Sequence, residues 1–214
     1  STILLICKDH QLISSFFGPL NLQLQHLARA RGATITMQYM SPEEIRRGVI
    51  PSLLQSADGV IGLELLMERL QEDHPFYEAS GGGVTLSGGE PLLQPAFLSH
   101  VLRLCKEAGI STCIDTSGVG YGNYEQILRY TDLVLYDVKH YDPEQYQRIT
   151  GQPIARTMQF IKAVKECGTP LWVRHVVVPG LTESEEHFRR LRAYAETLPN
   201  VQKLELLPYH CLGA

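Results

Sequence analysis

The sequence predicts an α/β protein built on a parallel sheet, and two observations carry that prediction. From residue 83 onward, short apolar runs alternate with segments of helical periodicity, the pattern of strands joined by helical crossovers. Nearly every predicted strand ends in polar residues, and the carboxyl ends of parallel strands meet at one edge of a sheet. We therefore expect a helix-covered sheet with a ligand site at that edge.

The first elements of this region follow one another closely. A strand is predicted over 84–87 and ends in two glycines. A helix is predicted over 92–107, because apolar residues recur there four apart and so lie on one helix face. Gly109 stands where a helix commonly stops. A strand over 111–115, a short helix around 124–130 and a strand over 133–139 complete this half.

The second half opens with a strong helix start. Asp142 is a favourable N-cap, and Pro143 suits the first helical position because it has no N–H to leave unbonded. A helix over 155–167 is stopped by Gly168, and a long strand covers 171–180.

Thr182 and Glu185 have the spacing of a capping box, which predicts a helix running to about residue 198. The last strand covers 201–207 and is followed by Pro-Tyr-His. Five strands result, and the polar residues at their ends are Glu90, Asp115, Thr116, Asp137, Lys139, Arg174, His175 and His210.

The pattern of residues 1–63 predicts a βαβαβ segment that looks unrelated to the rest and whose origin the sequence leaves open. Its strands cover 3–7, 33–38 and 60–63, and its helices cover 12–30 and a stretch that begins at Ser41. We place the seam near 63–67 and expect two parts, 1–63 and 64–214. The first part would add strands that complete the sheet of the second.

Composition excludes several classes of function. The net charge is −4 and no basic run offers a stripe that could neutralise phosphates, which argues against nucleic-acid binding. The arginines at 189, 190 and 192 lie among glutamates, as on a solvated helix face. No apolar run reaches the roughly 18–20 residues of a membrane span. Five cysteines, at 7, 105, 113, 167 and 211, are typical of a reducing, cytoplasmic compartment and form no compact metal-ligand cluster.

The glycine-rich stretch SGGGVTLSGGEPLLQP at 80–95 is not a phosphate loop. Gly83 and Gly88 have the separation found in a P-loop, but Gly89 stands where lysine is required, and Glu90 would repel a phosphate. Glycines let a ligand approach backbone carbonyls, and a carboxylate beside them suits an ammonium group. Lys139, Arg174 and His210 could hold a carboxylate. The strand ends therefore suit an amino-acid zwitterion, with a solvated Glu90 as the alternative.

Five motifs in this order are similar to those of a known family: FYEASGGGVTLSGGEPLLQP, CKEAGISTCIDTSG, TDLVLYDVKH, WVRHVVVPG and VQKLELLPYH. Together, over about 65–213, they resemble the radical S-adenosylmethionine activases of glycyl radical enzymes, and most closely the activases of pyruvate formate-lyase. The resemblance implies a partial (β/α) barrel, a [4Fe–4S] cluster, S-adenosylmethionine as cofactor, and a glycyl radical enzyme such as pyruvate formate-lyase as partner. Members of the family cleave the cofactor to a 5′-deoxyadenosyl radical, which takes hydrogen from a glycine of the partner.

The resemblance also implies roles for individual residues. Gly88, Gly89 and Glu90 match the element that meets the methionine ammonium group. Asp115, Thr116 and Asp137 match a monovalent-cation site beside the cofactor carboxylate. The family positions that contact or orient the cofactor are matched by Asp137, Lys139, Arg174 and His210.

One part of the family pattern is missing. The family holds its cluster with Cys-x3-Cys-x2-Cys after the first barrel strand, whereas upstream of Gly88 this sequence has only Cys7. Cluster ligation requires thiolates, so we expect no iron–sulfur ligands and no radical chemistry from this chain alone. It would then be a fragment, a chimera or a degenerate relative. The alternative is a non-catalytic module that binds S-adenosylmethionine or the partner, and acid–base catalysis by Asp115, Asp137, Lys139 and His210 ranks last.

Overall fold

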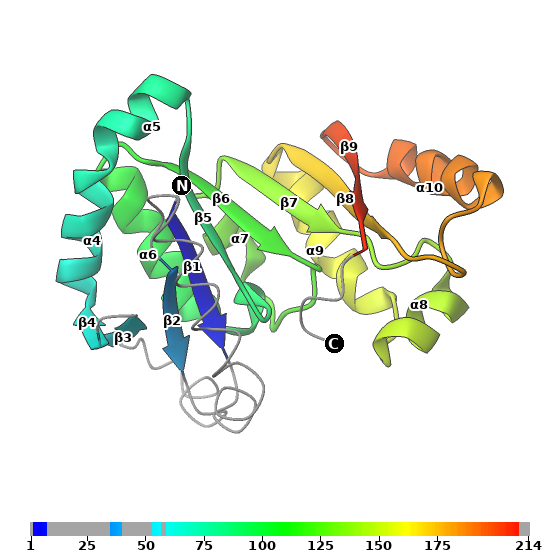
Figure 1. Ribbon diagram of the computed structural model, residues 1–214, viewed down its shortest axis with the longest axis horizontal. Coiled ribbons are helices and arrows are strands. Elements are labelled where there is room, and N and C mark those ends of the chain that lie inside the picture. The colour runs from blue at the N-terminus through cyan, green and yellow to red at the C-terminus, as the bar shows by residue number, and fades with distance from the viewer. Residues whose placement is uncertain (1, 8–34, 40–52, 57–58, 210–214) are drawn as a thin grey trace.

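The computed structural model describes residues 2–7, 35–39, 53–56 and 59–209. Within these residues the strands form one nine-stranded sheet in the order β4-β3-β2-β1-β5-β6-β7-β8-β9 (Figure 1). From β2 to β9 all neighbouring strands are parallel, as the sequence predicts. The α/β class is confirmed, and the sheet stays open at both edges.

The early strands are β1 (Thr2–Cys7), β2 (Ile35–Tyr39), β3 (Leu53–Ser56) and β4 (Gly59–Gly62). β1 pairs in parallel with both β2 and β5, so it joins the two parts of the chain directly. The expected helices over 12–30 and from Ser41 lie outside the described residues.

The prediction of a third parallel strand near residue 60 was wrong. β4 instead pairs antiparallel with β3, and β3 pairs antiparallel with β2. Only Ala57 and Asp58 separate β3 from β4, and so short a connection can join antiparallel strands but cannot cross over. The Asp58–Gly59 dipeptide is itself a hairpin signal.

Two helices, α4 (Leu63–Glu72) and α5 (His74–Ser80), lead into β5 (Gly83–Gly88). The expected helix over 92–107 is divided into a 3₁₀ turn, Pro91–Leu93, and α6 (Pro95–Glu107). Pro95 explains the division: its ring disfavours helical backbone at Gln94, which has φ −126° and ψ 59°. β6 (Ser111–Thr116) and α7 (Tyr124–Leu128) follow.

The remaining elements agree closely with expectation: β7 (Leu133–Asp137), α8 (Pro143–Thr150), α9 (Ala155–Cys167), β8 (Leu171–Val177), α10 (Glu185–Thr197) and β9 (Val201–Pro208). Asp142 caps α8 by accepting from the backbone N–H groups of Glu144 and Gln145, as predicted.

The capping box predicted at Thr182 was wrong. Ser184 caps α10, accepting from the His187 N–H at 3.2 Å. The Thr182 hydroxyl instead closes the preceding turn, where it accepts from the Val178 N–H at 2.7 Å and donates to the Val176 carbonyl.

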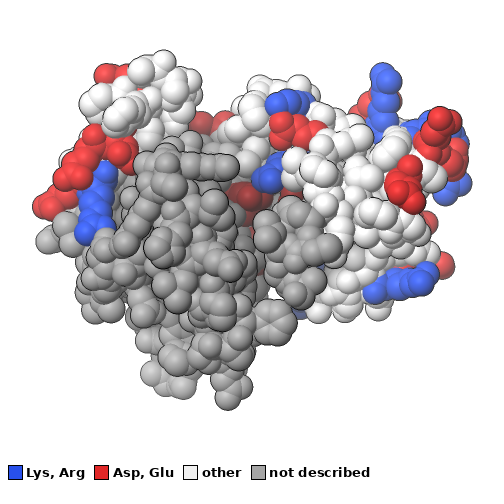
Figure 2. Space-filling view, viewed as in Figure 1, with Lys and Arg blue, Asp and Glu red and all other residues white. Residues whose placement is uncertain are grey.

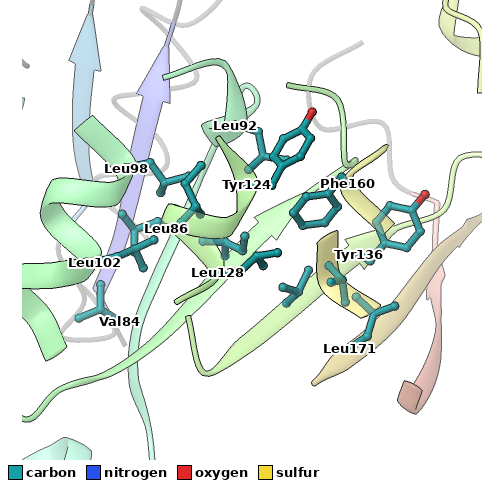
Figure 3. Packing of buried hydrophobic residues seen from close by; sticks show 14 of the residues in the cluster. Val84, Leu86, Leu92, Leu98, Leu102, Tyr124, Leu128, Tyr136, Phe160 and Leu171 are labelled. Carbon is teal, nitrogen blue, oxygen red and sulfur yellow. The ribbon is translucent and has the colours of Figure 1, made fainter. Parts of the chain in front are cut away.

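The core lies between the sheet and helices α6, α7 and α9, which cover one of its faces (Figure 1). Val84 and Leu86 of β5 meet Leu98 and Leu102 of α6 (Figure 3). Farther along the sheet, the ring of Phe160 packs edge-on against that of Tyr124, with centroids 5.4 Å apart. This packing fixes one face of the sheet and leaves the other for a site.

Candidate functional site

The two faces of strands β5 to β8 have different chemistry because successive side chains alternate. The residues facing the helices are buried and mostly apolar, with Ile114 and Val134 fully so. The alternate residues are only partly buried. Toward the C-terminal strand ends this second face becomes polar, and the residues concerned are Ser87, Asp115, Asp137 and Arg174.

Glu90 ties the end of β5 to the end of β6. Its Oε1 accepts from the Thr116 hydroxyl at 2.5 Å and the Leu92 N–H at 3.1 Å. Its Oε2 accepts from the Ser117 N–H at 2.8 Å and the Ser117 hydroxyl at 2.6 Å. A carboxylate has about four acceptor positions, and all are used here. Burial raises the pKa of Glu90, while its hydrogen bonds to Ser117, Thr116 and Leu92 oppose that rise.

Asp115 and Arg174 meet across an intervening strand. Arg174 lies on β8 and reaches over β7, placing its guanidinium nitrogen 3.1 Å from Oδ2 of Asp115 on β6. Ser87 donates its hydroxyl to the same oxygen at 3.1 Å. Burial and the nearby Asp137 charge raise the pKa of Asp115, and Arg174 opposes this rise. Two carboxylates therefore share this end of the sheet, and one of them, Asp115, is paired with a guanidinium.

Asp137 carries the least satisfied polar atom of the site. Its Oδ2 accepts from the Lys139 ammonium at 3.3 Å, but its Oδ1 is buried without a hydrogen-bond partner among the described residues. A buried anionic oxygen without a partner is costly. This oxygen therefore marks a place where a bound cation or a ligand N–H would be stabilised.

The glycines of the motif lie beside this cluster. Gly88 ends β5 with φ 140°, a conformation that residues with a Cβ rarely adopt. In the parallel register Gly88 pairs with Ile6, so Cys7, the next residue of β1, lies at the same end of the sheet.

A small hollow adjoins the charged residues. Its volume is about 100 Å³, and Asp137, Lys139 and Arg174 form one side of it. Ile149 and Leu181 give it an apolar wall. Sites that enclose drug-sized ligands have about 300–1,000 Å³, so this hollow fits part of a ligand, such as its amino-acid end. A larger hollow, of about 390 Å³, lies at the opposite, N-terminal strand ends near Gly83 and Trp172.

The structure brings most of the predicted site residues together. Asp115, Asp137, Lys139 and Arg174 share one end of the sheet, and Thr116 and Glu90 form the adjoining bridge. His210 lies outside the described residues. The prediction overlooked Ser87 and Ser117. The alternation along β5 could have identified Ser87, because it falls on the same face as Thr85.

The three cysteines whose side chains the structure describes do not suit an iron–sulfur cluster. Cys105 is buried in α6, Cys113 lies on β6 and Cys167 ends α9. Burial raises the pKa of Cys105 to about 12 and that of Cys113 to about 11. The three residues lie on different elements, whereas a cluster requires several thiolates around one site. Among the described residues no group of three potential ligands could hold a metal ion.

The arginines of α10 behave as the sequence predicts for a solvated helix face. Arg189 and Arg190 both pair with Glu186, and Arg192 pairs with Glu196. Positive and negative side chains are interspersed over this end of the molecule (Figure 2). Within the described part of the chain, no helix combines the length and apolarity needed to cross a bilayer.

Comparison with known proteins agrees with this geometry. A family model described as the radical SAM superfamily matches residues 59–191. The chain belongs to the radical SAM superfamily. This membership agrees with the family resemblance that the five sequence motifs indicated.

Two individual relatives that the chain matches share one name, pyruvate formate-lyase-activating enzyme. The chain is 54% identical over 150 residues to the pyruvate formate-lyase-activating enzyme of Clostridium pasteurianum, which covers 70% of this chain and 63% of that protein. It is 42% identical over 147 residues to the enzyme of that name from Staphylococcus aureus strain COL, covering 65% of this chain and 58% of that protein. The chain therefore spans less than two thirds of the length of these relatives.

Solved structures show the same likeness. A crystal structure of a domain of pyruvate-formate lyase-activating enzyme from Bacteroides vulgatus matches with a TM-score of 0.54 and 30% identity. That match covers 61% of this chain and 83% of the domain. Streptococcus suis SuiB bound to S-adenosylmethionine matches with a TM-score of 0.53 over 67% of this chain and 34% of that one. At 18% identity, the latter shows the fold alone.

Proposed function

We propose that this chain binds S-adenosylmethionine at the C-terminal ends of β5 to β8, as the cofactor-binding part of a glycyl-radical-enzyme activase. The observation that carries the proposal is the buried Oδ1 of Asp137, which has no hydrogen-bond partner among the described residues and belongs to a residue that lines the hollow with Lys139. Membership of the superfamily and identity to pyruvate formate-lyase-activating enzymes support the choice of ligand.

The amino-acid end of the cofactor carries a positive and a negative group, and the strand ends offer partners for both. Backbone carbonyls of the Gly88–Gly89 edge and the charge of Glu90 suit the ammonium group. Because the four acceptor positions of Glu90 are filled within the chain, it would act mainly through its field and by holding that edge in place. Lys139 and Arg174 suit the carboxylate, with His210 as a further contact.

We assign a monovalent-cation site to Asp115, Thr116 and Asp137. The two carboxylates repel one another, which contributes to the raised pKa of Asp115, and a cation between them would relieve that repulsion. The orphaned Oδ1 of Asp137 would be its strongest ligand. The Thr116 hydroxyl oxygen already accepts from the Gly118 N–H at 2.9 Å and keeps room for at most one further contact.

The partner of such an activase would be a glycyl radical enzyme such as pyruvate formate-lyase, the enzyme named in the curated relatives. Residues 59–209 contain the proposed cofactor pocket, and the cysteines described there form no thiolate set for a [4Fe–4S] cluster. We therefore propose that the chain binds the cofactor without cleaving it. Anaerobic reconstitution tests this: iron and sulfide should stay near background, and stoichiometric uptake of a four-iron cluster would refute it.

Calorimetric titration with S-adenosylmethionine tests the binding itself. Asp137→Asn keeps the size of the side chain and removes its charge, so affinity should fall about tenfold, the value of one charge-assisted contact. Asp132→Asn is the matched control, because Asp132 is a carboxylate at the other end of β7, paired with Lys106. Equal heats for all three proteins would show that the ligand binds elsewhere or not at all.

The cation assignment has its own test. Affinity measured in potassium or sodium chloride should exceed that in tetramethylammonium chloride at equal ionic strength, because the larger cation cannot enter between two carboxylates. Asp115→Asn should abolish the difference. Identical affinities in all three salts would remove the cation site and leave cofactor binding as a separate question.

A further inference from the structure

Three histidines gather next to the candidate site. The side chain of His175 alternates with that of Arg174 along β8, and His175 also lines the small hollow. His140 follows β7, His175 lies on β8 and His187 lies in the first turn of α10, and all three side chains are buried. The rings of His175 and His187 have centroids 5.0 Å apart and planes 29° from parallel, and His140 meets His187 edge-on at 5.1 Å. The proposed function uses none of them.

Hydrogen bonds determine which ring nitrogens carry protons. Nδ1 of His175 lies 2.7 Å from the Val138 carbonyl oxygen, which can only accept, so His175 carries its proton at Nδ1. Its Nε2 is then an acceptor, and the Nε2 of His187, 3.0 Å away, must donate. His140 accepts the Asp142 N–H at Nδ1, so its proton is at Nε2.

This chain of bonds leads to the backbone beneath the candidate site. Val138 follows Asp137 and precedes Lys139, the two residues that form one of the ion pairs of the site. Two hydrogen bonds connect Val138 to β8. The Val138 N–H donates to the Arg174 carbonyl at 2.9 Å, and the Val138 carbonyl accepts from the His175 ring. The second bond is made by a side chain, so its geometry depends on what orients that ring.

His187 is what orients the ring. The Ser184 cap fixes the first turn of α10, and from that turn His187 reaches Nε2 of His175. The charged groups near the cluster are Asp137 and Lys139 at the end of β7, Asp142 ahead of α8, and Arg190 of α10 beside Tyr141. Burial lowers the pKa of all three rings, which supports neutral imidazoles with fixed tautomers.

We propose that His187 is a positioning residue for the strand-end site: by donating to Nε2 of His175 it fixes the ring that holds the Val138 carbonyl, and thereby the backbone between Asp137 and Lys139. The inference rests on the proposed function only for the identity of the ligand. The positioning of the backbone is a property of the chain without ligand.

Nuclear magnetic resonance tests the positioning on the ligand-free chain. Long-range ¹⁵N spectra should show His175 protonated at Nδ1 and His187 at Nε2. Val138 amide exchange should rise about fivefold or more in His187→Leu, about the equilibrium factor for one lost hydrogen bond. His187→Gln, whose amide can still donate, should exchange like the wild type.

Leu191→Ala is the matched control, because Leu191 is buried on the same helix and lies outside the hydrogen-bond chain. It should destabilise the chain while leaving Val138 exchange unchanged relative to global unfolding. An Nε2-protonated His175 in the wild type would overturn the proposal, as would equal Val138 exchange in His187→Leu and Leu191→Ala. If His187→Leu does not fold, His187→Asn, whose amide is too short to reach His175, takes its place.

Titration with S-adenosylmethionine then connects the positioning to the site. Affinity should fall about five- to tenfold in His187→Leu and stay within about twofold of wild type in His187→Gln and Leu191→Ala. Unchanged affinity in His187→Leu despite faster Val138 exchange would overturn the link to the site. If the wild type does not bind the cofactor while the ligand-free results hold, the proposed function fails and the positioning of the backbone stands.

Discussion

His187 should make the stability of this chain fall as the pH is lowered below neutrality. Burial lowers the pKa of His187 to about 4, and the neighbouring His175 and His140 contribute to that shift. Its ordinary value is 6.5. Between these two pH values the unfolded chain binds a proton that the folded chain does not, so stability rises with pH across this window and is lost as the pH falls.

The size of the effect follows from the shift. One pKa unit corresponds to about 1.4 kcal/mol, so a group shifted from 6.5 to about 4 destabilises the fold by about 2 kcal/mol between pH 7 and pH 5. His187→Gln keeps a hydrogen-bond donor toward His175 but cannot titrate. As the pH falls from 7 to 5, the free energy of unfolding of the variant should therefore decrease by about 2 kcal/mol less than that of the wild type.

Urea denaturation followed by circular dichroism at several pH values between 5 and 7 measures this difference. The difference between the two proteins removes the contributions of the carboxylates and of the other histidines to the pH dependence, because these groups titrate in both. The surrounding charges act in opposite directions, since Asp142 favours protonation of His140 and Lys139 disfavours that of His175. Parallel pH dependences for wild type and variant, within about 0.5 kcal/mol, would refute the assignment of His187 as a buried neutral ring.

Three further changes test the packing and the caps. Glu90→Gln should lower the free energy of unfolding by about 1–3 kcal/mol in urea titrations, because one backbone N–H of Ser117 or Leu92 would face an amide nitrogen; a neutral effect would contradict the bridge. Ser184→Ala should cost about 0.5–2 kcal/mol by removing the cap of α10, as thermal unfolding would report, and a silent change would show that another group caps it. Phe160→Ala, fully buried against Tyr124, should cost about 3–5 kcal/mol, and a loss below about 1 kcal/mol would show that the core closes over the cavity.

Local chemistry made many elements predictable from the sequence. Asp142 with Pro143 specifies the start of α8, and Gly168 in the left-handed conformation ends α9, because few other residues satisfy those backbone positions. The meeting of Asp115, Asp137 and Arg174 was also predictable, since parallel strands bring their carboxyl ends to one edge.

Other features depend on tertiary contacts that periodicity does not encode. Thr182 and Ser184 are both acceptable caps in the sequence, and only the turn that consumes the Thr182 hydroxyl leaves the role to Ser184. The four bonds to Glu90 likewise join residues on neighbouring strands. The histidine pair of β8 and α10 forms only once the helix has packed on the sheet.

The hairpin of β3 and β4 differs from these cases. Its Asp58–Gly59 signal was present in the sequence, and weighting it above the expectation of a crossover would have given the antiparallel pairing.

The location of S-adenosylmethionine on the chain is the most direct test of the account. Among the described residues, the hollow at the C-terminal strand ends beside Asp137 competes for it with the larger one at the N-terminal ends beside Trp172. Amide chemical shifts recorded during a titration with the cofactor distinguish them. We expect the largest changes at Gly88, Asp137 and Arg174, whereas changes confined to Gly83 and Trp172, or none at saturating cofactor, would contradict the proposed function.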